Sequence, residues 1–267
     1  MLRPFLKWAG GKYELLRHIK KFLPKGKRLI EPFAGSACVF LNSNYSQYLI
    51  ADNNVDLINL YKILQTEGRT FIKECKQLFS SRNNTSEAFY CLRDEFNKSN
   101  DPRRRSMLFV YFNRHGFNGL CRYNSKGKFN VPFGKYEKPM LPSERMLTFH
   151  KKSQAATFVH SDFATIMAQA DQGDVIYCDP PYVPLSKTAN FTNYSSDSFT
   201  YPEQIKLAEL ARKCAAKGIH VIISNHDNPQ TRKLYHDANK ISILVRRNIS
   251  ANGKNRQKVK EILAVFA

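Results

Sequence analysis

The tetrapeptide DPPY, residues 179–182, has the residue types and spacing to bind a planar group that carries an NH2. It directly follows an apolar, β-rich run at 175–178 that is typical of a buried strand, and open α/β sheets bind ligands at the carboxyl ends of such strands. An ionised Asp179 only accepts hydrogen bonds, and the Pro180 carbonyl is a second acceptor on a restricted backbone. The Tyr182 ring offers a surface on which a base could stack. A proline-stiffened turn after a core strand is the alternative interpretation.

Segments near the start of the chain could hold a second ligand beside this tetrapeptide. RLIEPFAGSACVFL, residues 28–41, is typical of a strand, a turn of small residues and a helix, and small residues let a ligand approach the backbone closely. A second expected strand, 47–51, is followed by Asp52, 17 residues after Gly35. An acidic residue at roughly this distance is placed to bind ribose hydroxyls. A packing joint and a helix cap remain alternatives.

The first segment carries Gly10 and Gly11 ahead of a helical pattern over 13–23, flanked by Lys7, Trp8 and Lys12. A glycine-rich turn that opens a helix can present backbone N–H groups to an anion. The spacing of a P-loop is absent.

The alternation of strands and helices elsewhere predicts an α/β fold with a mostly parallel sheet. Further strands are expected at 157–160, 175–178, 220–224, 241–246 and 261–266, and helices at 163–170, 202–217 and 229–238. Only a short basic loop, 247–258, with an Asn252-Gly253 turn signal separates the last two strands, so that pair is expected to be antiparallel at the sheet edge. The cations of the loop could contact a nucleic-acid backbone or could discourage aggregation of the edge.

Between residues 55 and 142 the pattern becomes helical and polar, and the strand–helix alternation stops. Helices are expected at 56–65, 70–79, 86–97 and 102–112. We therefore expect an inserted, mainly helical domain at 55–142 and a second domain formed by 1–54 and 143–267.

The charge of the chain predicts a polyanionic partner. Its 267 residues include 42 Lys plus Arg and 22 Asp plus Glu, a net charge of +20. Residues 102–154 hold twelve basic and two acidic residues, and this difference of +10 is half of the total. Within 111–136, basic residues alternate with amides and with aromatics such as Phe117, Tyr123, Phe129 and Tyr136. Exposed aromatics there would suit phosphate contact, base reading and intercalation together. A solvated basic loop, with a hairpin turn at 125–129, is the alternative.

Several other classes of protein are disfavoured by the sequence. No apolar stretch approaches the roughly 20 residues of a spanning helix, and the first residues lack the pattern of a signal peptide. The six cysteines are scattered without a C-x-x-C pair, which disfavours a zinc site and favours reduced thiols. We expect a cytoplasmic protein that binds no metal.

The motifs together, in their order along the chain, closely resemble the Dam-type DNA adenine N6-methyltransferases. The motifs are KWAGGK (7–12), EPFAGSACVF (31–40), the acid at 52, RHGFNGLCRYN (114–124), NVPFGKY (130–136), DPPY (179–182) and SNHD (224–227). The resemblance implies a Rossmann-like, mostly parallel sheet that binds S-adenosylmethionine, with an antiparallel C-terminal edge hairpin and an inserted helical domain that recognises DNA. It also implies methylation of adenine in GATC in double-stranded DNA with base flipping, by a monomer associated with the nucleoid.

The resemblance also assigns roles to residues. Catalysis is assigned to Asp179, Pro180, Pro181 and Tyr182, which would orient the amine of a flipped adenine for direct in-line transfer. Cofactor binding is assigned to Trp8, Lys12, Phe33, Gly35, Asp52, Asp162 and Asp179. DNA binding is assigned to Lys7, Arg93, Phe117, Asn118, Leu120, Arg122, Asn124, Pro132, Lys135 and Tyr136, with Arg122 on a guanine and Phe117 in the space left by the flipped base.

The sequence departs from the family pattern at three positions. Ala37 replaces the last glycine of F-x-G-x-G, and Phe117 and Lys135 stand where the family often has Tyr and Arg. Two other functions stay open: a methyltransferase that acts on cytosine N4 or on RNA, and a catalytically silent DNA-binding protein of the same fold. Asp rather than Ser at position 179 favours adenine, and the intact tetrapeptide argues against a silent protein.

Overall fold

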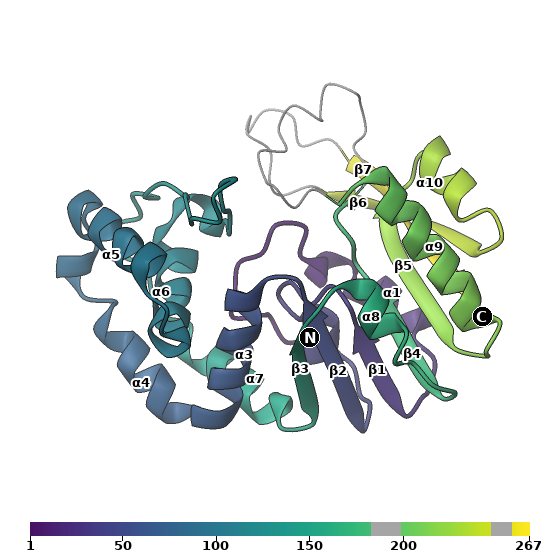
Figure 1. The fold of residues 1–267 in the computed structure, drawn as a ribbon, viewed down its shortest axis with the longest axis horizontal. Helices are drawn as coiled ribbons and strands as arrows, with labels where there is room; N and C mark the ends of the chain where they lie inside the picture. The colour runs from purple at the N-terminus through teal and green to yellow at the C-terminus, as the bar shows by residue number, and fades with distance from the viewer. Residues whose placement is uncertain (183–198, 247–257) are drawn as a thin grey trace.

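A seven-stranded sheet organises the computed structural model, which describes residues 1–182, 199–246 and 258–267 (Figure 1). The strand order is β3-β2-β1-β4-β5-β7-β6; the first five strands pair in parallel, and β7 is antiparallel to both β5 and β6. The strands are β1 (Arg28–Glu31), β2 (Gln47–Asp52), β3 (Ala156–His160), β4 (Asp174–Cys178), β5 (His220–His226), β6 (Asn239–Arg246) and β7 (Lys258–Phe266). The predicted α/β fold and the antiparallel final pair are confirmed, with β7 between β5 and β6. The predicted basic loop lies outside the described residues except for Lys258.

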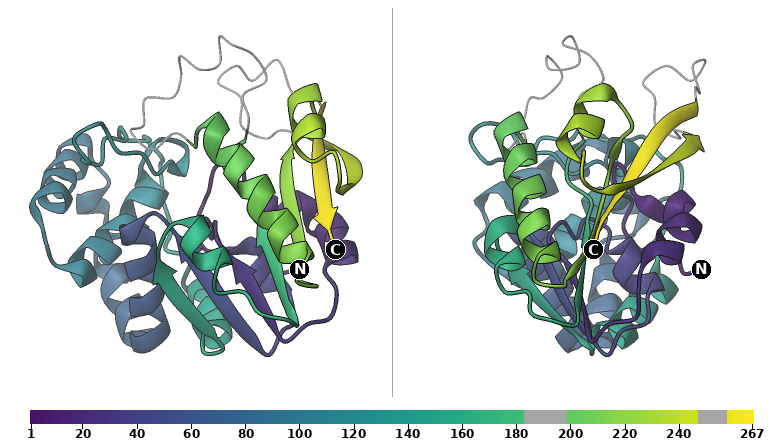
Figure 2. Two further views of the ribbon diagram at one scale, coloured as in Figure 1. Left: turned by 45° about the vertical axis from the view of Figure 1, so that its right-hand side comes forward. Right: turned by 90° about the vertical axis from the view of Figure 1, so that its right-hand side faces the viewer.

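The sheet has an apolar cluster on each face, and helices cover both. Alternate residues of a central strand enter the two different clusters. Leu29, Val175 and Tyr177 belong to one cluster, whereas Ile30 and Ile176 belong to the other. Side chains alternate between the two faces of a strand, so a strand buried on both faces is apolar without interruption. Figure 2 shows α8 (Phe163–Met167) and α9 (Tyr201–Ala215) on the face opposite α1 (Leu16–Phe22).

The remaining helices mostly agree with the expected ones to within a few residues. They are η1 (Lys12–Leu15), α2 (Cys38–Asn42), α3 (Val55–Glu67), α4 (Arg69–Gln77), η2 (Ser81–Asn83), α5 (Ser86–Lys98), α6 (Pro102–His115), η3 (Phe117–Gly119), α7 (Ser143–Ser153) and α10 (Pro229–Leu234). Helix α7 was not predicted from the sequence, and its buried side includes only Met146, Phe149 and Ser153. So short an apolar pattern is hidden among the basic residues around it.

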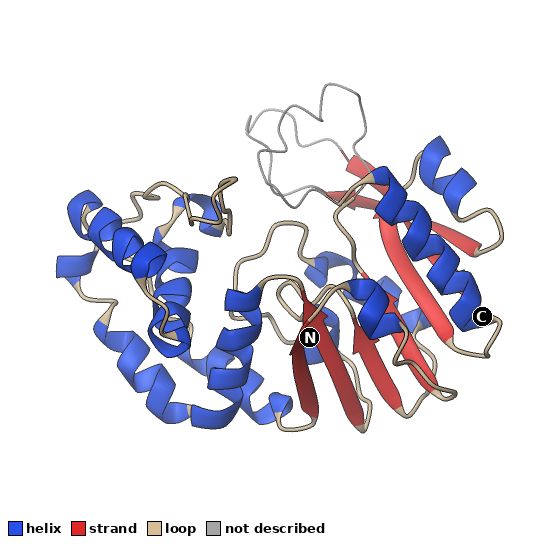
Figure 3. Cartoon of the chain, in the orientation of Figure 1, coloured by secondary structure: helices blue, strands red, loops and turns tan. Residues whose placement is uncertain are grey.

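Aromatic packing joins the helical part of the chain to the sheet. Tyr61 of α3 stacks on Phe149 of α7 with ring centroids 4.7 Å apart, and Phe149 stacks on Phe158 of β3 at 5.8 Å. Figures 1 and 3 show α3 and α7 beside the β3 edge of the sheet, with α4, α5 and α6 beyond them. Because the contact is a buried, close-packed cluster, it fixes the helices relative to the carboxyl ends of the strands.

The described residues contain no helix long and apolar enough to cross a membrane. They also contain no group of three or more His, Cys, Asp or Glu side chains that could hold a metal ion. All six cysteines are free thiols.

Candidate active site

One large cleft opens at the carboxyl ends of β1, β2 and β4. The sheet order reverses at β1, which pairs with β2 on one side and β4 on the other, and ligands bind at such a switch point. The cleft has a volume of about 1740 Å³, above the roughly 300–1,000 Å³ of most small-molecule sites. Its lining includes Lys7, Trp8, Lys12, Phe33, Gly35, Asp52, Asn118, Arg122, Asp162, Asp179, Pro180, Pro181 and Tyr182. Residues assigned to the cofactor, to catalysis and to DNA therefore share one space.

Asp179 directly follows β4 and has both of its side-chain partners on one oxygen. Lys12 Nζ lies 2.9 Å from Oδ1, and Ser224 Oγ donates to the same oxygen at 3.1 Å. Oδ2 has no hydrogen-bond partner within the part of the chain that the structure describes. Burial raises the pKa of Asp179, and the Lys12 ammonium opposes that effect. The side chain remains 22 % exposed, so Oδ2 is the acceptor available to a ligand.

Tyr182 is held by its hydroxyl and by its ring. The hydroxyl donates to Glu261 Oε2 at 2.6 Å, and burial raises the pKa of Tyr182 well above 10, which keeps the donor protonated. Its ring meets His226 edge-on with centroids 4.7 Å apart, and Lys12 Nζ lies 4.7 Å from the ring centroid, within cation–π range.

The two prolines between these residues lie in different surroundings. Pro180 is buried, whereas Pro181 is exposed and its carbonyl accepts a 2.7 Å hydrogen bond from Gln204 Nε2 of α9. Cys178, immediately before the tetrapeptide, is fully buried, and burial raises the pKa of its thiol well above 9. A protonated, buried thiol is no nucleophile.

Asp52, at the end of β2, holds the turn after β1. Its Oδ2 accepts from the Gly35 N–H at 3.0 Å, and its Oδ1 accepts from the Asn54 N–H at 2.9 Å. Gly35 has a φ of 45°, and a Cβ there would lie 2.8 Å from Trp8 Nε1, so only glycine fits. Each carboxylate oxygen keeps acceptor capacity for the hydroxyls of a ligand.

Phe33 and Asp162 lie on the same side of the cleft. The Phe33 ring stacks on Phe163 at 5.5 Å and meets Phe199 edge-on at 5.4 Å. Asp162 Oδ1 caps α8 by accepting from the N–H groups of Ala164 and Thr165. A hydrogen bond from the Thr165 hydroxyl lowers the pKa of Asp162.

On the other side of the cleft, the N-terminal segment meets the segment 117–136. Lys7 Nζ lies 4.5 Å from the centroid of the Tyr136 ring, and the Tyr136 hydroxyl accepts from the Asn118 N–H at 3.0 Å. Burial lowers the pKa of Lys7, and Arg114 lowers it further. Phe117 is 50 % exposed, and its N–H donates to the Pro132 carbonyl.

The other residues assigned to DNA also lie on or near this segment. Arg122 is exposed and donates through Nε to Asn130 Oδ1 at 2.8 Å. Asn124 Oδ1 accepts from the N–H groups of Lys126 and Lys128, which closes the expected hairpin turn. Arg93 of α5 donates to the Val131 carbonyl at 3.2 Å, Leu120 is half-buried, and Lys135 is exposed with a φ of 53°.

Comparison with known proteins decides the family. The model of the D12 class N6 adenine-specific DNA methyltransferases matches residues 8–249. The chain belongs to this family. It is 51% identical over 264 residues to the DNA adenine methylase of Escherichia coli (strain K12), covering 99% of this chain and 95% of that protein. The DNA adenine methylases of Vibrio cholerae serotype O1 and of Serratia marcescens are each 50% identical over 265 residues, covering 99% of this chain and 96% and 98% of those proteins. The predicted family and an adenine-specific DNA methyltransferase activity are confirmed.

In this methyltransferase the aromatics of segment 117–136 are less exposed than predicted. Phe129 is 2% exposed and stacks on Phe112 with ring centroids 5.0 Å apart. Tyr123 is half-buried, and its hydroxyl donates to Asp56 Oδ2 at 2.6 Å. The prediction of exposed aromatics was wrong for Phe129, and Tyr123 and Tyr136 are only partly exposed, because one face of the segment packs inward. Phe117 is the strongly exposed aromatic.

Part of the basic cluster is also structural. Arg103 pairs with Glu67 and Glu74, and its neighbours on α6 pair likewise: Arg104 with Glu95, and Arg105 with Asp56. These three arginines account for a quarter of the twelve basic residues counted in the sequence. The excess of positive charge alone could not distinguish these three arginines from the basic residues that form no ion pair with another described residue.

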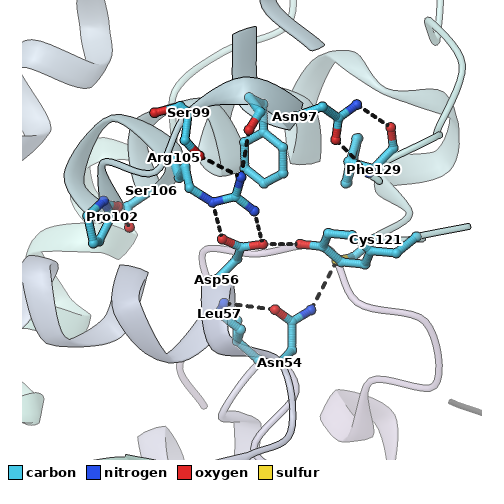
Figure 4. A network of polar contacts seen from close by, with 12 residues as sticks. Asn54, Asp56, Leu57, Asn97, Ser99, Pro102, Arg105, Ser106, Cys121 and Phe129 are labelled. Carbon is cyan, nitrogen blue, oxygen red and sulfur yellow. Dashed lines mark hydrogen bonds and ion pairs between the residues drawn. The ribbon is translucent and has the colours of Figure 1, made fainter. Parts of the chain in front are cut away.

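A polar network joins the turn after Asp52 to segment 117–136 (Figure 4). Asn54 Nδ2 donates to Cys121 Sγ at 3.4 Å, and Arg105 donates to both carboxylate oxygens of Asp56 at 2.7 Å. Asn97 binds the N–H and the carbonyl of Phe129. This network was not predicted from the sequence, because its partners lie 32 to 67 residues apart and no local motif marks them.

Proposed function

We propose that this methyltransferase transfers the methyl group of S-adenosylmethionine to adenine N6 within GATC in double-stranded DNA, with the base rotated out of the duplex. The observation that carries the proposal is that Asp52 and the available Oδ2 of Asp179 line one cleft, whose volume of about 1740 Å³ exceeds that of most small-molecule sites. Residues 1–54 and 143–267 would hold the cofactor, and residues 55–142 would recognise DNA.

The residues around Asp52 suit the cofactor. The Asp52 carboxylate would accept from the ribose hydroxyls, while Gly35 lets the cofactor approach the backbone beside Trp8. Phe33 and Lys12 line the same cleft, and Asp162 lies at its edge as a helix cap. When bound, the cofactor supplies an electrophilic methyl group on a sulfonium.

The tetrapeptide would then orient the adenine amine. The lone pair of N6 is delocalised into the ring, which makes it a poor nucleophile. Donation of the two N–H groups to Asp179 Oδ2 and to the Pro180 carbonyl would localise that lone pair and aim it at the methyl group, while Tyr182 stacks on the ring. Proton loss can follow transfer, so no strong general base is required.

Segment 117–136 and Lys7 would supply DNA recognition. Rotating a base out of the duplex costs a few kcal/mol, which contacts with the basic surface would offset. The half-exposed Phe117 would fill the space left by the base, and Arg122 would bind a guanine. Lys7, Asn118, Leu120, Pro132 and Tyr136 would contact bases, and Arg93, Asn124 and Lys135 the phosphate backbone.

The proposal is tested by transfer of tritiated methyl groups to duplexes that contain GATC or scrambled variants, followed by identification of the modified nucleoside. We expect label only in N6-methyl-2′-deoxyadenosine from GATC duplexes, and efficient labelling of scrambled duplexes would contradict the proposed site. An otherwise identical duplex with the target adenine opposite a mismatch should be methylated faster, because less pairing energy opposes flipping. Equal single-turnover rates for the two duplexes would count against flipping as a significant barrier.

Asp179→Ala should lower kcat by at least about a hundredfold, because it removes the acceptor for the amine. DNA affinity should stay within a few-fold of the wild type, since Asp179 lies on the sheet side of the cleft. Single-turnover methyl transfer and equilibrium DNA binding measure the two effects separately. Asp237→Ala, which removes an aspartate paired with Arg212 on the surface, is the matched control. Robust methyl transfer by Asp179→Ala would sink the assigned role.

A further inference from the structure

Three consecutive residues of β5 support the DPPY tetrapeptide, and the function proposed above gives them no role. Ser224 and His226 contact it directly, and Asn225 reaches it through Gln204. We propose that Ser224 is a positioning residue: its hydroxyl fixes the Asp179 carboxylate so that Oδ2 faces the adenine amine. This inference rests on the proposed role of Asp179 and extends it to a residue that touches neither substrate nor cofactor.

The register of the sheet places Ser224 beside Asp179. In the parallel pair of β4 and β5, Cys178 lies opposite Ile223, so the next residues of the two strands face each other. Tyr177 and Asp179 project to the same face because side chains alternate along a strand. The Ser224 hydroxyl consequently lies between them, 3.0 Å from the Tyr177 hydroxyl and 3.1 Å from Asp179 Oδ1.

The direction of these hydrogen bonds follows from proton counting. An ionised carboxylate only accepts, and a serine hydroxyl has one proton to donate. The Asp179 oxygen, at 3.1 Å, lies closer to Ser224 Oγ than the other acceptor, the Cys178 carbonyl at 3.4 Å, so Ser224 donates to Asp179 and Tyr177 donates to Ser224. Burial raises the pKa of Tyr177 well above 10, so its proton is retained, and both side chains are almost fully buried. In such a chain each hydrogen bond strengthens the next.

These hydrogen bonds determine which oxygen of the Asp179 carboxylate is available to the substrate. Ser224 and Lys12 both bind Oδ1, from β5 and from the N-terminal segment respectively. Two donors on one oxygen, in different directions, restrict rotation of the carboxyl group and leave Oδ2 toward the cleft. Without the Ser224 hydroxyl, the Lys12 ammonium alone could be bound by either oxygen, and the amine would lose a fixed acceptor.

The two residues that follow Ser224 brace the rest of the tetrapeptide. Asn225 donates to Gln204 Oε1 at 3.1 Å, and Gln204 in turn holds the Pro181 carbonyl. His226 packs against the Tyr182 ring, and Glu261, which lies opposite His226 in the β5–β7 register, accepts from the Tyr182 hydroxyl. One strand thus supports the acceptor, the backbone and the ring of the site.

Steady-state kinetics of Ser224→Ala test the proposal. We expect kcat to fall about 10- to 100-fold, because small misplacement of reacting groups has effects of this size. The KM values for DNA and cofactor should stay within about threefold, since Ser224 contacts neither ligand. Ser224→Thr, which keeps the hydroxyl, should recover most of kcat. Ser153→Ala removes another fully buried serine, in α7, and is the matched control with unchanged kinetics.

A double variant separates positioning from stability. Ser224→Ala leaves the buried Tyr177 hydroxyl without its acceptor and should lower the unfolding temperature, whereas Tyr177→Phe/Ser224→Ala removes both partners and should restore much of it. We expect kcat of the double variant to remain low. Recovery of kcat together with the unfolding temperature would show a merely structural role and overturn the proposal.

Asp179→Ala, measured in parallel, separates this inference from the function on which it rests. An active Asp179→Ala would overturn the proposed function itself. An inactive Asp179→Ala beside a fully active Ser224→Ala would overturn the inference alone.

Discussion

The carboxyl ends of the strands around Asp179 and the segment 117–136 hold their functional groups in different ways. At the carboxyl ends of the strands, side chains from other strands fix both residues of the site. Ser224 of β5 donates to Asp179 at 3.1 Å, and Glu261 of β7 accepts from the Tyr182 hydroxyl at 2.6 Å. In segment 117–136, Phe117 is 50 % exposed, and Arg122 is exposed with Asn130 as its partner. One region fixes side chains, whereas the other fixes the backbone that carries them.

This difference matches the role proposed for each region. A reaction that gains mainly from positioning requires polar groups that need no rearrangement when the substrate arrives. Side chains that bind bases must adjust to DNA, so a rigid backbone with exposed side chains is sufficient. In segment 117–136 inward anchors such as Phe129 hold the backbone, which keeps Asn118 and Lys135 in left-handed conformations.

The largest expected effect tests whether Asp56 anchors segment 117–136. Asp56 is 4% exposed and binds Arg105 and the Tyr123 hydroxyl, so Asp56→Ala leaves a largely buried guanidinium with carbonyl acceptors but without its carboxylate. We expect a loss of about 3–5 kcal/mol in the free energy of unfolding. Urea denaturation followed by circular dichroism measures it.

The matched control is the neighbouring ion pair, between Arg104 of α6 and Glu95 of α5. Arg104 pairs with Glu95, which is 40 % exposed, so Glu95→Ala should cost no more than about 1 kcal/mol. Similar losses for Asp56→Ala and Glu95→Ala would contradict an anchoring role for the buried pair.

The second effect depends on pH and concerns a residue at the carboxyl ends of the strands. Glu31, at the end of β1, is 2% exposed, and its Oε1 has no partner among the described residues. Burial raises its pKa to about 8, from an ordinary value of 4.5. Between these two values the folded protein keeps the proton and the unfolded chain does not, so the contribution of Glu31 to stability falls as pH rises.

Glu31→Gln removes this titration. The stability of the wild type minus that of the variant should fall between pH 5 and 8, by on the order of 1 kcal/mol per pH unit, and level off above the pKa of about 8. Chemical denaturation of both proteins over that range measures the difference. A difference that stays constant with pH would show that Glu31 is ionised in the folded protein.

The third effect concerns base recognition by segment 117–136. Arg122→Ala should reduce discrimination at one base pair of the target by about 1–3 kcal/mol, because the variant loses the bidentate contact with guanine proposed for Arg122. Methyl transfer to GATC and to duplexes with single substitutions measures it. Lys126→Ala, at the exposed tip of the same hairpin, should weaken binding to every sequence alike. A uniform loss in both variants would refute a base contact by Arg122.

The same contrast explains what the sequence could and could not predict. The β4 strand was expected at 175–178 and spans Asp174–Cys178, because a strand buried on both faces is continuously apolar. The place of Asp179 followed directly from that strand. The positions of Ser224 and Glu261 beside the tetrapeptide did not, since they depend on the register of strands that are distant in sequence.

Segment 117–136 was predicted less well for a related reason. Its composition indicated nucleic acid, but alternating aromatic and basic residues fit an exposed surface and a hairpin with one buried face equally well. Packing of Phe129 against α5 and α6 decides between them, and no local pattern records that packing.

The smallest effect tests the one departure from the family pattern in the turn beneath the proposed cofactor site. Ala37 has a φ of 54°, in the left-handed region that disfavours every residue with a Cβ, and it is fully buried. Ala37→Gly relieves roughly 1 kcal/mol of backbone strain but removes a buried methyl group and increases the entropy of the unfolded chain. These terms nearly cancel, so the net change in stability should be below about 1 kcal/mol.

Ala34→Gly, in the same turn with no left-handed φ to relieve, should be more destabilising by about 1 kcal/mol. Equal losses in thermal or chemical denaturation would show that the turn holds Ala37 without strain.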